Sequence, residues 1–536
     1  MCSHRFRWVF CQLEVLRHCF PVNLRCALKE MPKSLDETYE RILKGINKAH
    51  REYAYLLLRC LTVAVRPLQV EELAEVLVVD LKPGELPKLN ADWRWEDQEE
   101  VVLSACSSLV TVNVVNGSRV VQFSHFSVKE FMTSDRLATP EFHISLEPSH
   151  ATLAQACLCV LLGLDDQANE DSKTIPLVRY AAEYWVKHAQ SANEKLGITD
   201  TMVHFLDLDK PHFSAWVRIQ GLSDLLKRSR SEQPRTAPPL AAPLYFAAEN
   251  GFRGLVERMI VKHPLLLDTW GGVYGTPFHA SVIGGQIEVA RFLVTRVTDV
   301  DARSADNWTP LHFAANNGHL EISRILFEHH AEVNARDRDG RTPLHYASWK
   351  GHLDVVRLLV DRGADARIRD NSGDSPLYFA MTSRQLDVAR ILLIKNEAEA
   401  DARDDSGRTF LHCASAQGHD DVVRFFLDLH ADVDALDNGG NTPLHWAASN
   451  GNLEVIRILL AHNAEVDARN YEGCTPLHKT SDGEPGAVQL LLDRNADMYA
   501  YNDCGETPLH IAAATGSIEV AQILFEHVRK TSQNNS

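Results

Sequence analysis

The chain has 536 residues, of which 45% are hydrophobic, and a formal net charge of −17. Its length exceeds what one hydrophobic core usually serves and predicts three or four structural units. The negative charge disfavours nucleic acid and anionic membrane surfaces as partners, and the sequence contains no apolar run of about 18 residues that could span a bilayer.

The start of the chain, MCSHRF, does not lead into the apolar core and small-residue cleavage site of a signal peptide. The eleven cysteines are an odd number without CxxC spacing, and eight of them precede residue 160. This usage predicts buried free thiols in a reducing compartment rather than disulfides. We therefore expect a cytoplasmic protein without a membrane partner.

Three helices are predicted directly after residue 33. Ser34 and the acidic residues behind it form a typical helix start, followed by apolar residues at helical spacing. Further helices are expected near residues 53–65 and 70–77, because Pro67 interrupts the backbone between them.

Two β-branched runs, residues 109–115 and 119–123, flank Asn116-Gly117, a strong signal for a hairpin turn. Three helices followed by a hairpin is the order of elements in a winged helix. We expect a winged-helix-like domain over residues 34–145.

A winged helix raises the possibility of DNA binding, which needs clustered Lys or Arg against the phosphates. Arg119 is the only permanently charged residue in the predicted hairpin, and the expected recognition helix carries Glu71, Glu72 and Glu75. We therefore predict no nucleic-acid partner. Salt-sensitive duplex binding by residues 35–135 alone would support the DNA-binding alternative.

The next part of the chain contains amphipathic helices near residues 151–164 and 177–189, which predict a helical domain over residues 146–226. Residues 227–241 combine charge, serine and proline without apolar periodicity, as is typical of a surface linker. Six of the 28 glycines precede residue 250, so the chain becomes rich in turns only beyond this linker.

The segment Thr-Pro-Leu-His, or a close variant, then recurs at a nearly constant period. Between Thr309 and Thr475 the successive copies are 33, 33, 34, 33 and 33 residues apart. A fixed period of this length predicts a solenoid of stacked supersecondary units. Its prolines are Pro243, Pro277, Pro310, Pro343, Pro376, Pro443, Pro476 and Pro508, with Phe410 in the remaining place.

Each residue type in the repeat has a structural explanation. Thr342 can cap a helix, and Pro343 fits its first position, where the missing N–H costs nothing. Gly340 permits a tight turn, and Gly351 can end the helix in a left-handed conformation. Two antiparallel helices and a projecting loop per repeat are predicted. Small residues allow neighbouring helices to approach closely at Ala314, Ala347, Ala414, Ala447 and Ala512.

This pattern, G-x-T-P-L-H-x-A followed by G-H, V-V-x-x-L-L and D-A, resembles the ankyrin repeat. The fold class we expect is mainly α: an ankyrin-repeat solenoid of about nine repeats over residues 242–530, preceded by the winged-helix-like and helical domains. Residues 531–536 are expected to be a disordered tail. The resemblance implies that a protein ligand binds the concave face formed by the loops and first helices.

Segments before residue 230 resemble the region that follows the nucleotide-binding core of fungal NACHT–ankyrin proteins, which are STAND-type signalling proteins. They are RWVFCQL (7–13), MPKSLDETYERIL (31–43), RPLQVEELA (66–74) and HFSVKEF (125–131). The resemblance implies that residues 1–33 are the tail of a NACHT-associated helical region, and that ligand capture by the repeats takes part in non-self recognition.

The chain departs from that family in one respect. It contains no Gly-Lys dipeptide and therefore no G-x-x-x-x-G-K-[ST] phosphate loop. We expect a recognition or scaffold protein that is not an enzyme and has no cofactor. The alternative is a truncated NTPase signalling protein whose NACHT core lies upstream; genomic sequence encoding a phosphate loop before Met1 would support it.

Two groups of residues could suggest metal sites. The histidines that recur once per repeat are spaced too widely to converge on one zinc ion, so we predict that they brace loops through hydrogen bonds. The aspartate-rich stretches at residues 401–405 and 432–435 lack the spacing of a calcium loop, and we expect them to solvate loops. No G-x-S-x-G or Cys–His catalytic motif is present.

Partner contacts are expected at loop tips and at the ends of the first helices, where the repeat tolerates any residue and where aromatic and arginine side chains are the usual anchors. Within this set, the segment from Trp308 to Lys350 is the strongest cluster. The candidate protein-binding residues are Trp308, Arg338, Arg341, Trp349, Lys350, Arg408, Asn438, Tyr471 and Glu472.

Three irregularities predict weaker repeats. Phe410 replaces the helix-starting proline of repeat six, Ser383-Arg384-Gln385 replaces the glycine of repeat five, and repeat eight loses a residue and gains Pro485. The ligand, the oligomeric state and the downstream pathway do not follow from the sequence.

Overall fold

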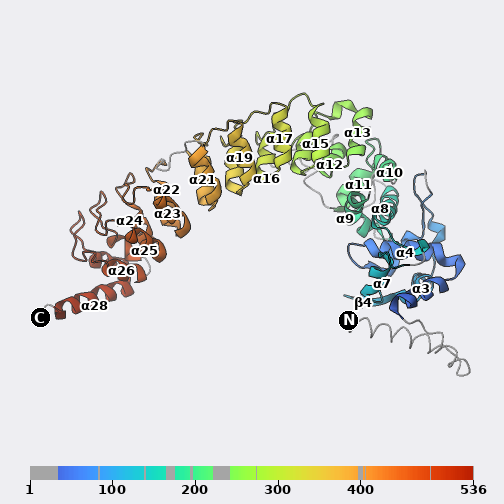
Figure 1. Cartoon of the computed structure of the whole chain (residues 1–536), viewed down its shortest axis with the longest axis horizontal. Coiled ribbons are helices and arrows are strands. Elements are labelled where there is room, and N and C mark those ends of the chain that lie inside the picture. Colours follow the sequence, from blue (N-terminus) through green and yellow to red (C-terminus); the bar gives the residue numbers. More distant parts are fainter. Residues whose placement is uncertain are drawn as a thin grey trace, which may run out of the picture. The chain divides into compact units, whose positions relative to one another are not determined.

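The computed structural model describes residues 34–82, 85–137, 140–164, 175–192, 197–220, 242–272, 274–395, 403–404, 406–482 and 485–534 (Figure 1). The chain divides into two compact units, Met1–Val289 and Ala290–Ser536. The predicted NACHT-associated tail, residues 1–33, and the predicted linker, residues 227–241, lie outside the described residues.

The described part of unit one starts with a winged helix, as predicted. The Ser34 side chain caps its first helix by accepting a hydrogen bond from the Glu37 amide at 3.1 Å. The elements in chain order are α3 (Leu35–Gly45), η2 (Lys48–His50), α4 (Arg51–Val63), β1 (Leu68–Gln69), α5 (Val70–Val76), β2 (Val79–Asp80), β3 (Lys88–Leu89), η3 (Ala91–Trp93), α6 (Gln98–Cys106), η4 (Ser107–Leu109), β4 (Val110–Val115), β5 (Ser118–Phe123), α7 (Phe126–Met132) and η5 (Pro140–Phe142).

The hairpin of the wing has the predicted two-residue turn. Asn116 and Gly117 both have positive φ, 50° and 82°, which matches the twist of the flanking strands. Strand β4 pairs antiparallel with β5 from Val110 opposite Phe123 to Val115 opposite Ser118. Strand β1 pairs with the other side of β5, so the sheet order is β1-β5-β4.

The predicted position of the recognition helix was wrong, because the structure has a further helix, α6, before the wing. The sequence analysis placed that helix at residues 70–77, but α6 lies between α5 and the wing in chain order and packs against α5. Its sequence, QEEVVLSAC, has no clear amphipathic spacing, which explains why periodicity did not reveal it. The charge argument is unchanged, because α6 carries Glu99 and Glu100 and no basic residue.

A helical region follows in unit one, with α8 and α9 at the predicted places and two further helices. Its core is aromatic: the Trp185 ring lies 5.5 Å from Phe205 and 5.7 Å from Trp216, between ring centroids. Both tryptophans are at most 2% exposed. The helices are α8 (Leu146–Leu162), α9 (Val178–Ser191), α10 (Ile198–Phe205) and α11 (His212–Gln220).

The first helix pair of the repeat array shares this aromatic core. Phe246 lies 5.0 Å from Trp216, and Phe252 lies 6.0 Å from Trp185, between ring centroids. The elements of this part are α12 (Ala242–Glu249), α13 (Arg253–Lys262), η9 (Pro264–Leu266) and α14 (Pro277–Ile283), followed by α15 (Ile287–Val294), in which the division between the units falls.

Unit two is a stack of helix pairs, which Figure 1 shows in successive layers. The helix pairs follow the 33-residue period because the short first helix of each pair starts at, or just after, the recurring Thr-Pro segment or its variant. Their bounds are α16 (Pro310–Asn317) and α17 (Leu320–Glu328), α18 (Pro343–Lys350) and α19 (Leu353–Asp361), α20 (Pro376–Thr382) and α21 (Leu386–Lys395), α22 (Phe410–Gln417) and α23 (Asp420–Asp428), α24 (Pro443–Ser449) and α25 (Leu453–Ala461), η10 (His478–Asp482) and α26 (Pro485–Leu492), α27 (Pro508–Thr515) and α28 (Ile518–Asn534).

The five predicted close-approach alanines are all at most 3% exposed, and Gly351 ends α18 with φ 76°, as predicted. The irregular repeats differ in their backbone. Arg384 adopts φ 58° where other repeats have glycine, and repeat eight replaces the first α-helix with the 3₁₀ helix η10. Helix α28 extends to Asn534, into the tail that the sequence analysis expected to be disordered.

Candidate functional site

The histidine of each Thr-Pro-Leu-His segment closes a capping box at the start of the first helix. In α16 the backbone N–H of Thr309 donates to His312 Nδ1 at 3.1 Å, and the Thr309 hydroxyl lies 2.9 Å from the same nitrogen. Proline occupies the first helical position, where no N–H is needed. The same box occurs in α14, α18, α22, α24 and α27.

The other ring nitrogen joins one repeat to the next. Because Nδ1 accepts, a neutral ring carries its proton on Nε2 and can donate it. His312 Nε2 lies 3.1 Å from the Arg341 carbonyl oxygen and His445 Nε2 lies 3.0 Å from that of Cys474, each 29 residues downstream. His345, His412 and His478 make the equivalent bonds. The predicted loop-bracing role of these histidines is confirmed.

Burial keeps these rings neutral. Removal from water lowers the pKa of His312, His345 and His445 to about 4 and also lowers the pKa of His412 and His478. Over the described residues, no group of three or more His, Cys, Asp or Glu side chains is placed to hold a metal ion.

The loop aspartates do more than solvate the loops. Asp404 Oδ1 accepts the backbone N–H groups of Ser406 and Arg408, both at 2.9 Å. Asp337 does the same for Asp339 and Arg341. Other aspartates reach the neighbouring loop: Asp434 Oδ1 accepts the Glu465 amide at 3.0 Å. Their carboxylates therefore satisfy backbone donors within and between the loops.

An aromatic cluster runs along the first helices of repeats three to five, with Phe313 and Tyr346 buried at 7% and 4% exposure and the other members partly or well exposed. The Trp308 ring lies 4.9 Å from Phe313 and 4.3 Å from Tyr346. In the next repeat the Arg341 guanidinium lies 4.9 Å from the centre of the Phe379 ring. We define the aromatic face as Trp308, Phe313, Arg341, Tyr346, Trp349, Lys350 and Phe379.

The exposed end of the aromatic face is Trp349 with Lys350. Trp349 is 42% exposed, and its ring lies 6.3 Å from Phe379. The Lys350 ammonium lies 4.4 Å from the centre of the Trp349 ring, a cation–π distance. An apolar ring beside an accessible cation suits a partner that presents an apolar and an acidic side chain.

The structure therefore brings together the four predicted residues Trp308, Arg341, Trp349 and Lys350. Tyr346 and Phe379, which connect them, were missed. The signal for them was present in the sequence, since the residue after the motif histidine is aromatic in three repeats: Phe313, Tyr346 and Trp446. Phe379 occupies the same position in repeat five, where Tyr378 replaces the histidine.

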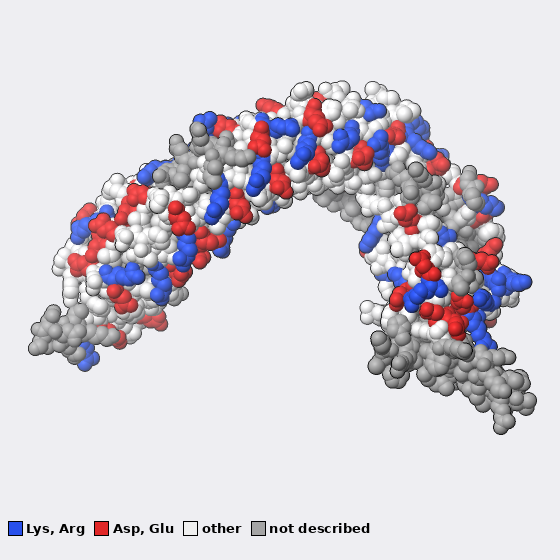
Figure 2. All heavy atoms as spheres, viewed as in Figure 1, with Lys and Arg blue, Asp and Glu red and all other residues white. Residues whose placement is uncertain are grey.

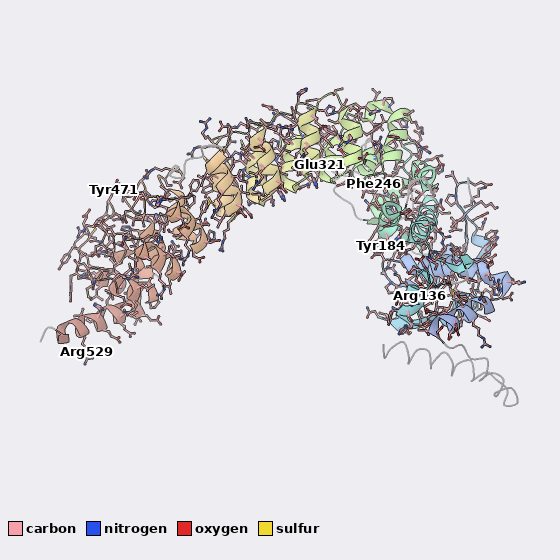
Figure 3. All side chains as sticks on the ribbon, viewed as in Figure 1. Arg136, Tyr184, Phe246, Glu321, Tyr471 and Arg529 are labelled. Carbon is pink, nitrogen blue, oxygen red and sulfur yellow. The ribbon has the colours of Figure 1, made fainter. Side chains whose placement is uncertain are left out.

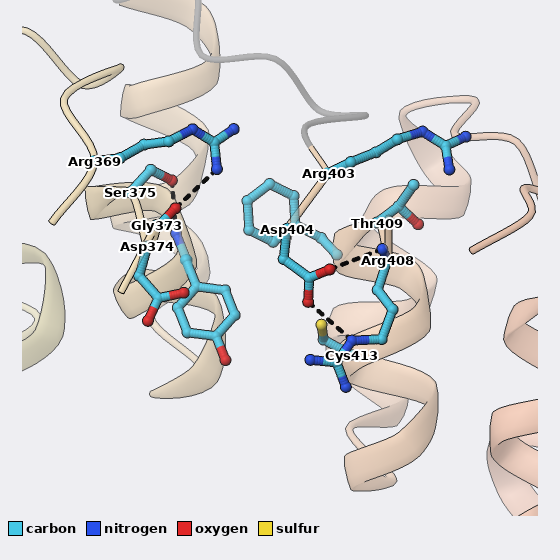
Figure 4. Close-up of a pocket in the computed structure, with 11 residues that line it drawn as sticks. Arg369, Gly373, Asp374, Ser375, Arg403, Asp404, Arg408, Thr409 and Cys413 are labelled. Carbon is cyan, nitrogen blue, oxygen red and sulfur yellow. Dashed lines mark hydrogen bonds and ion pairs between the residues drawn. The ribbon is translucent and has the colours of Figure 1, made fainter. Parts of the chain in front are cut away.

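Arg408 lies beyond a gap in this aromatic series, because Cys413 occupies the equivalent position in repeat six. Its Nε donates to Asp404 at 2.8 Å, and its guanidinium lies 5.6 Å from the Trp446 ring. A small pocket of about 20 Å³ opens here, lined by Tyr378 and Cys413 among others. Figure 4 shows that arginine and aspartate side chains surround it.

The remaining predicted residues lie on the row of loops. The backbone N–H of Arg338, Asn438 and Tyr471 donates to a carbonyl of the preceding loop at 3.2, 2.9 and 3.0 Å. Tyr471, labelled in Figure 3, is 69% exposed. Glu472 pairs with Lys479 at 2.8 Å. These tips join adjacent loops by their backbones and leave their side chains accessible.

The surface charge of the chain is mixed. Figure 2 shows Lys and Arg interspersed with Asp and Glu on the viewed face of unit two. In the winged helix, Arg119 pairs with Glu71 and Glu99, both at 2.7 Å, so carboxylates neutralise the charge of the wing. This pairing leaves little positive charge for phosphate contacts. In the described part of the chain, no helix is long and apolar enough to cross a membrane.

Stacked helix pairs with braced loops define a repeat protein, a class that presents an extended lateral surface to other proteins. Residues 244–337, 286–370, 333–404, 392–470 and 466–535 match the family described as ankyrin repeats (3 copies). The chain belongs to the ankyrin repeat family, whose fold is typically non-enzymatic and serves as a scaffold for protein partners. Residues 39–145 match the family described as GPI inositol-deacylase, winged helix domain.

A curated relative is azaphilone pigments biosynthesis cluster protein L of Monascus ruber, 29% identical over 294 residues, which cover 51% of this chain and 61% of the relative. The chain thus spans less than two thirds of that protein. Similar solved structures include the ankyrin repeat domain of Bcl-3 (27% identity, 40% of this chain and 98% of that one, TM-score 0.38) and that of human ASB11 (29% identity, 41% and 97%, TM-score 0.37).

Proposed function

We propose that this chain is a non-enzymatic recognition protein that captures a protein ligand on the concave side of its ankyrin repeats. The observation that carries the proposal is the aromatic face, where four candidate residues from two repeats gather around Tyr346 and Phe379. Aromatic rings beside arginine and lysine are the residue types that anchor most protein interfaces. The loop-tip residues Arg338, Asn438, Tyr471 and Glu472, with Arg408, extend the contact surface.

The winged helix and the helical region relay or scaffold the binding event. They carry no phosphate loop, and the paired Arg119 gives the wing no clustered positive charge for DNA. Together with the resemblance to NACHT–ankyrin proteins, this supports a sensor part of a STAND-type signalling or non-self recognition system in the cytoplasm.

The aromatic face is tested by selecting peptides from a random phage-displayed library on the purified chain and measuring their affinity for variants. We expect Trp349→Ala to weaken binding of the selected peptides at least ~10-fold, because truncating an aromatic hot-spot residue costs ~2 kcal/mol or more. The matched control is Trp93→Ala in the winged helix, where the replaced ring is 52% exposed. Circular dichroism checks that both variants fold.

Equal weakening by both substitutions, or no effect of Trp349→Ala, would place the binding surface elsewhere. A separate measurement addresses the absence of catalysis: robust ATP or GTP hydrolysis by the purified chain, above that of a mock preparation, would contradict a non-enzymatic role and favour the NTPase alternative.

A further inference from the structure

The last helix pair, α27 and α28, exposes apolar positions that internal repeats cover. Phe525 is the eighth residue of α28 and is 64% exposed, whereas the eighth residues of α23 and α25, Leu427 and Leu460, are 7% and 8% exposed. Ile518, the first residue of α28, is 70% exposed. The corresponding residue of α25, Leu453, is only partly exposed.

Two glycines of this last repeat also lack the neighbouring atoms that equivalent glycines of internal repeats have. A Cβ added to Gly473 would meet the Asp503 backbone nitrogen of the following loop at 2.8 Å, while the equivalent Gly505 has no atom within 4 Å. Gly418 would meet the Asn452 side chain at 2.8 Å, and the equivalent Gly516 again meets nothing. The face of α27 and α28 is therefore a repeat-stacking surface that no described residue covers.

Helix α28 carries a second apolar stripe suited to pairing with another helix. It has 17 residues, whereas α17, α19, α23 and α25 have nine each. Val520 and Leu524 face the interior at 3% and 1% exposure. Ile518, Ala521, Phe525 and Val528 are spaced three, four and three residues apart, which is the seam spacing of two packed helices.

Head-to-tail stacking of two copies is disfavoured. It would need an uncovered first helix pair, but Phe246 and Phe252 of that pair already contact Trp216 and Trp185. A two-fold arrangement needs only one patch that is complementary to itself. Helix α28 meets this requirement, because Glu519 is its second residue and Arg529, labelled in Figure 3, lies toward its C-terminal end. Antiparallel pairing brings the helix end that carries Glu519 near the partner's end that carries Arg529 and also opposes the two helix dipoles.

We infer that two copies of this chain associate through antiparallel packing of α28 on α28 of the second copy, with Ile518, Ala521, Phe525 and Val528 in the seam. This association is independent of ligand capture on the aromatic face. It would double the number of ligand-binding surfaces in the assembly and thereby raise avidity for a multivalent ligand.

Sedimentation velocity of the 536-residue chain at ~50 µM tests the inference, because small interfaces associate weakly and a high concentration favours the dimer. We expect a species of twice the monomer mass of 60.1 kDa. Phe525→Glu should weaken dimerisation at least ~100-fold, because it buries unpaired like charges at the seam. The matched control, Leu265→Glu, replaces a side chain that is 88% exposed in unit one and should leave the dimer intact.

The antiparallel geometry has its own test by charge reversal. Glu519→Arg and Arg529→Glu should each weaken the dimer, and the double variant should restore it, because each helix then offers the reversed pair to its partner. A monomeric wild-type chain at this concentration would overturn the inference. So would a dimer that survives Phe525→Glu, or one that Leu265→Glu disrupts equally.

Discussion

The recurring histidine uses its two ring nitrogens for two different contacts, one within its own repeat and one with the next repeat. Nδ1 accepts the N–H that starts its own helix, and Nε2 lies within hydrogen-bonding distance of a carbonyl of the following loop, as in His445 with Thr442 and Cys474. Both bonds require the neutral ring in one tautomer, since protonation turns the Nδ1 acceptor into a donor that faces an N–H. The stability of the array is therefore linked to pH.

The sign of this linkage follows from the lowered pKa values. Each ring has a lower pKa in the folded chain, about 4 for His312, His345 and His445, than its ordinary value of 6.5. The contribution of the neutral rings to the free energy of unfolding is fully present above pH 6.5 and is lost as the pH falls toward 4. At pH 5 the free energy of unfolding is expected to be lower by about 2 kcal/mol for each of these three rings than at neutral pH.

Thermal unfolding of unit two, followed by calorimetry between pH 7.5 and 5, measures this effect. We expect the midpoint to fall steeply below pH 6.5. His445→Gln should lower stability at pH 7.5 but flatten the pH dependence, whereas His50→Gln, at an exposed position, should change neither. An unchanged slope in His445→Gln would contradict the assigned ring state.

Among the secondary-structure elements, the loops are more constrained than their polar sequences suggest. Gly440 has φ 73°, and an added Cβ would meet the Tyr471 backbone nitrogen at 2.8 Å. Gly505 has nearly the same φ, 77°, but meets nothing within 4 Å. Both positions therefore require the left-handed backbone conformation, but only Gly440 also lacks space for a side chain beside the next loop.

Alanine substitution at both positions uses this difference. Gly505→Ala should cost about 1 kcal/mol through the left-handed backbone alone. Gly440→Ala should cost at least ~2 kcal/mol, because the backbone of the next loop must also move. Calorimetric midpoints of the two variants provide the comparison, and equal shifts would show that the contact with Tyr471 carries no energetic weight.

The elements also show which parts of this fold are readable from sequence. The repeat helices were predictable because Thr, Pro, His and Gly recur in register and each has a local role. The wing was predictable from Asn116-Gly117 between β-branched runs. Helix α6 was not, since QEEVVLSAC lacks a helical stripe, and its position depends on packing against α5. Tyr346 and Phe379 were missed because their role as connectors of the aromatic face depends on contacts between repeats.

Across the chain, the repeats are not equivalent. In repeat five, Arg384 holds φ 58° in place of a glycine, a conformation that costs a non-glycine residue about 1 kcal/mol. In repeat six, Phe410 replaces proline and stacks on Phe426 at 5.4 Å. In repeat eight, the first helix is the five-residue 3₁₀ helix η10, whose hydrogen bonds have poorer geometry.

Native-state hydrogen exchange can rank these repeats. We expect amides in α20, α22 and η10 to exchange at least ~10-fold faster than those in α18 and α24, because local opening follows local stability. The regular repeats of the same molecule are the internal reference. Uniform protection from α16 to α25 would show that stacking between repeats overrides the irregularities.

The aromatic core that Trp185 and Trp216 share with Phe246 and Phe252 bears on how this protein can be divided for experiments. A fragment cut at the start of the repeats, near residue 242, would leave Phe246 and Phe252 without the rings that shield them from water, and such freshly exposed aromatic surfaces promote aggregation. A fragment of the ankyrin array that keeps this core covered must therefore retain the helices from α8 onward.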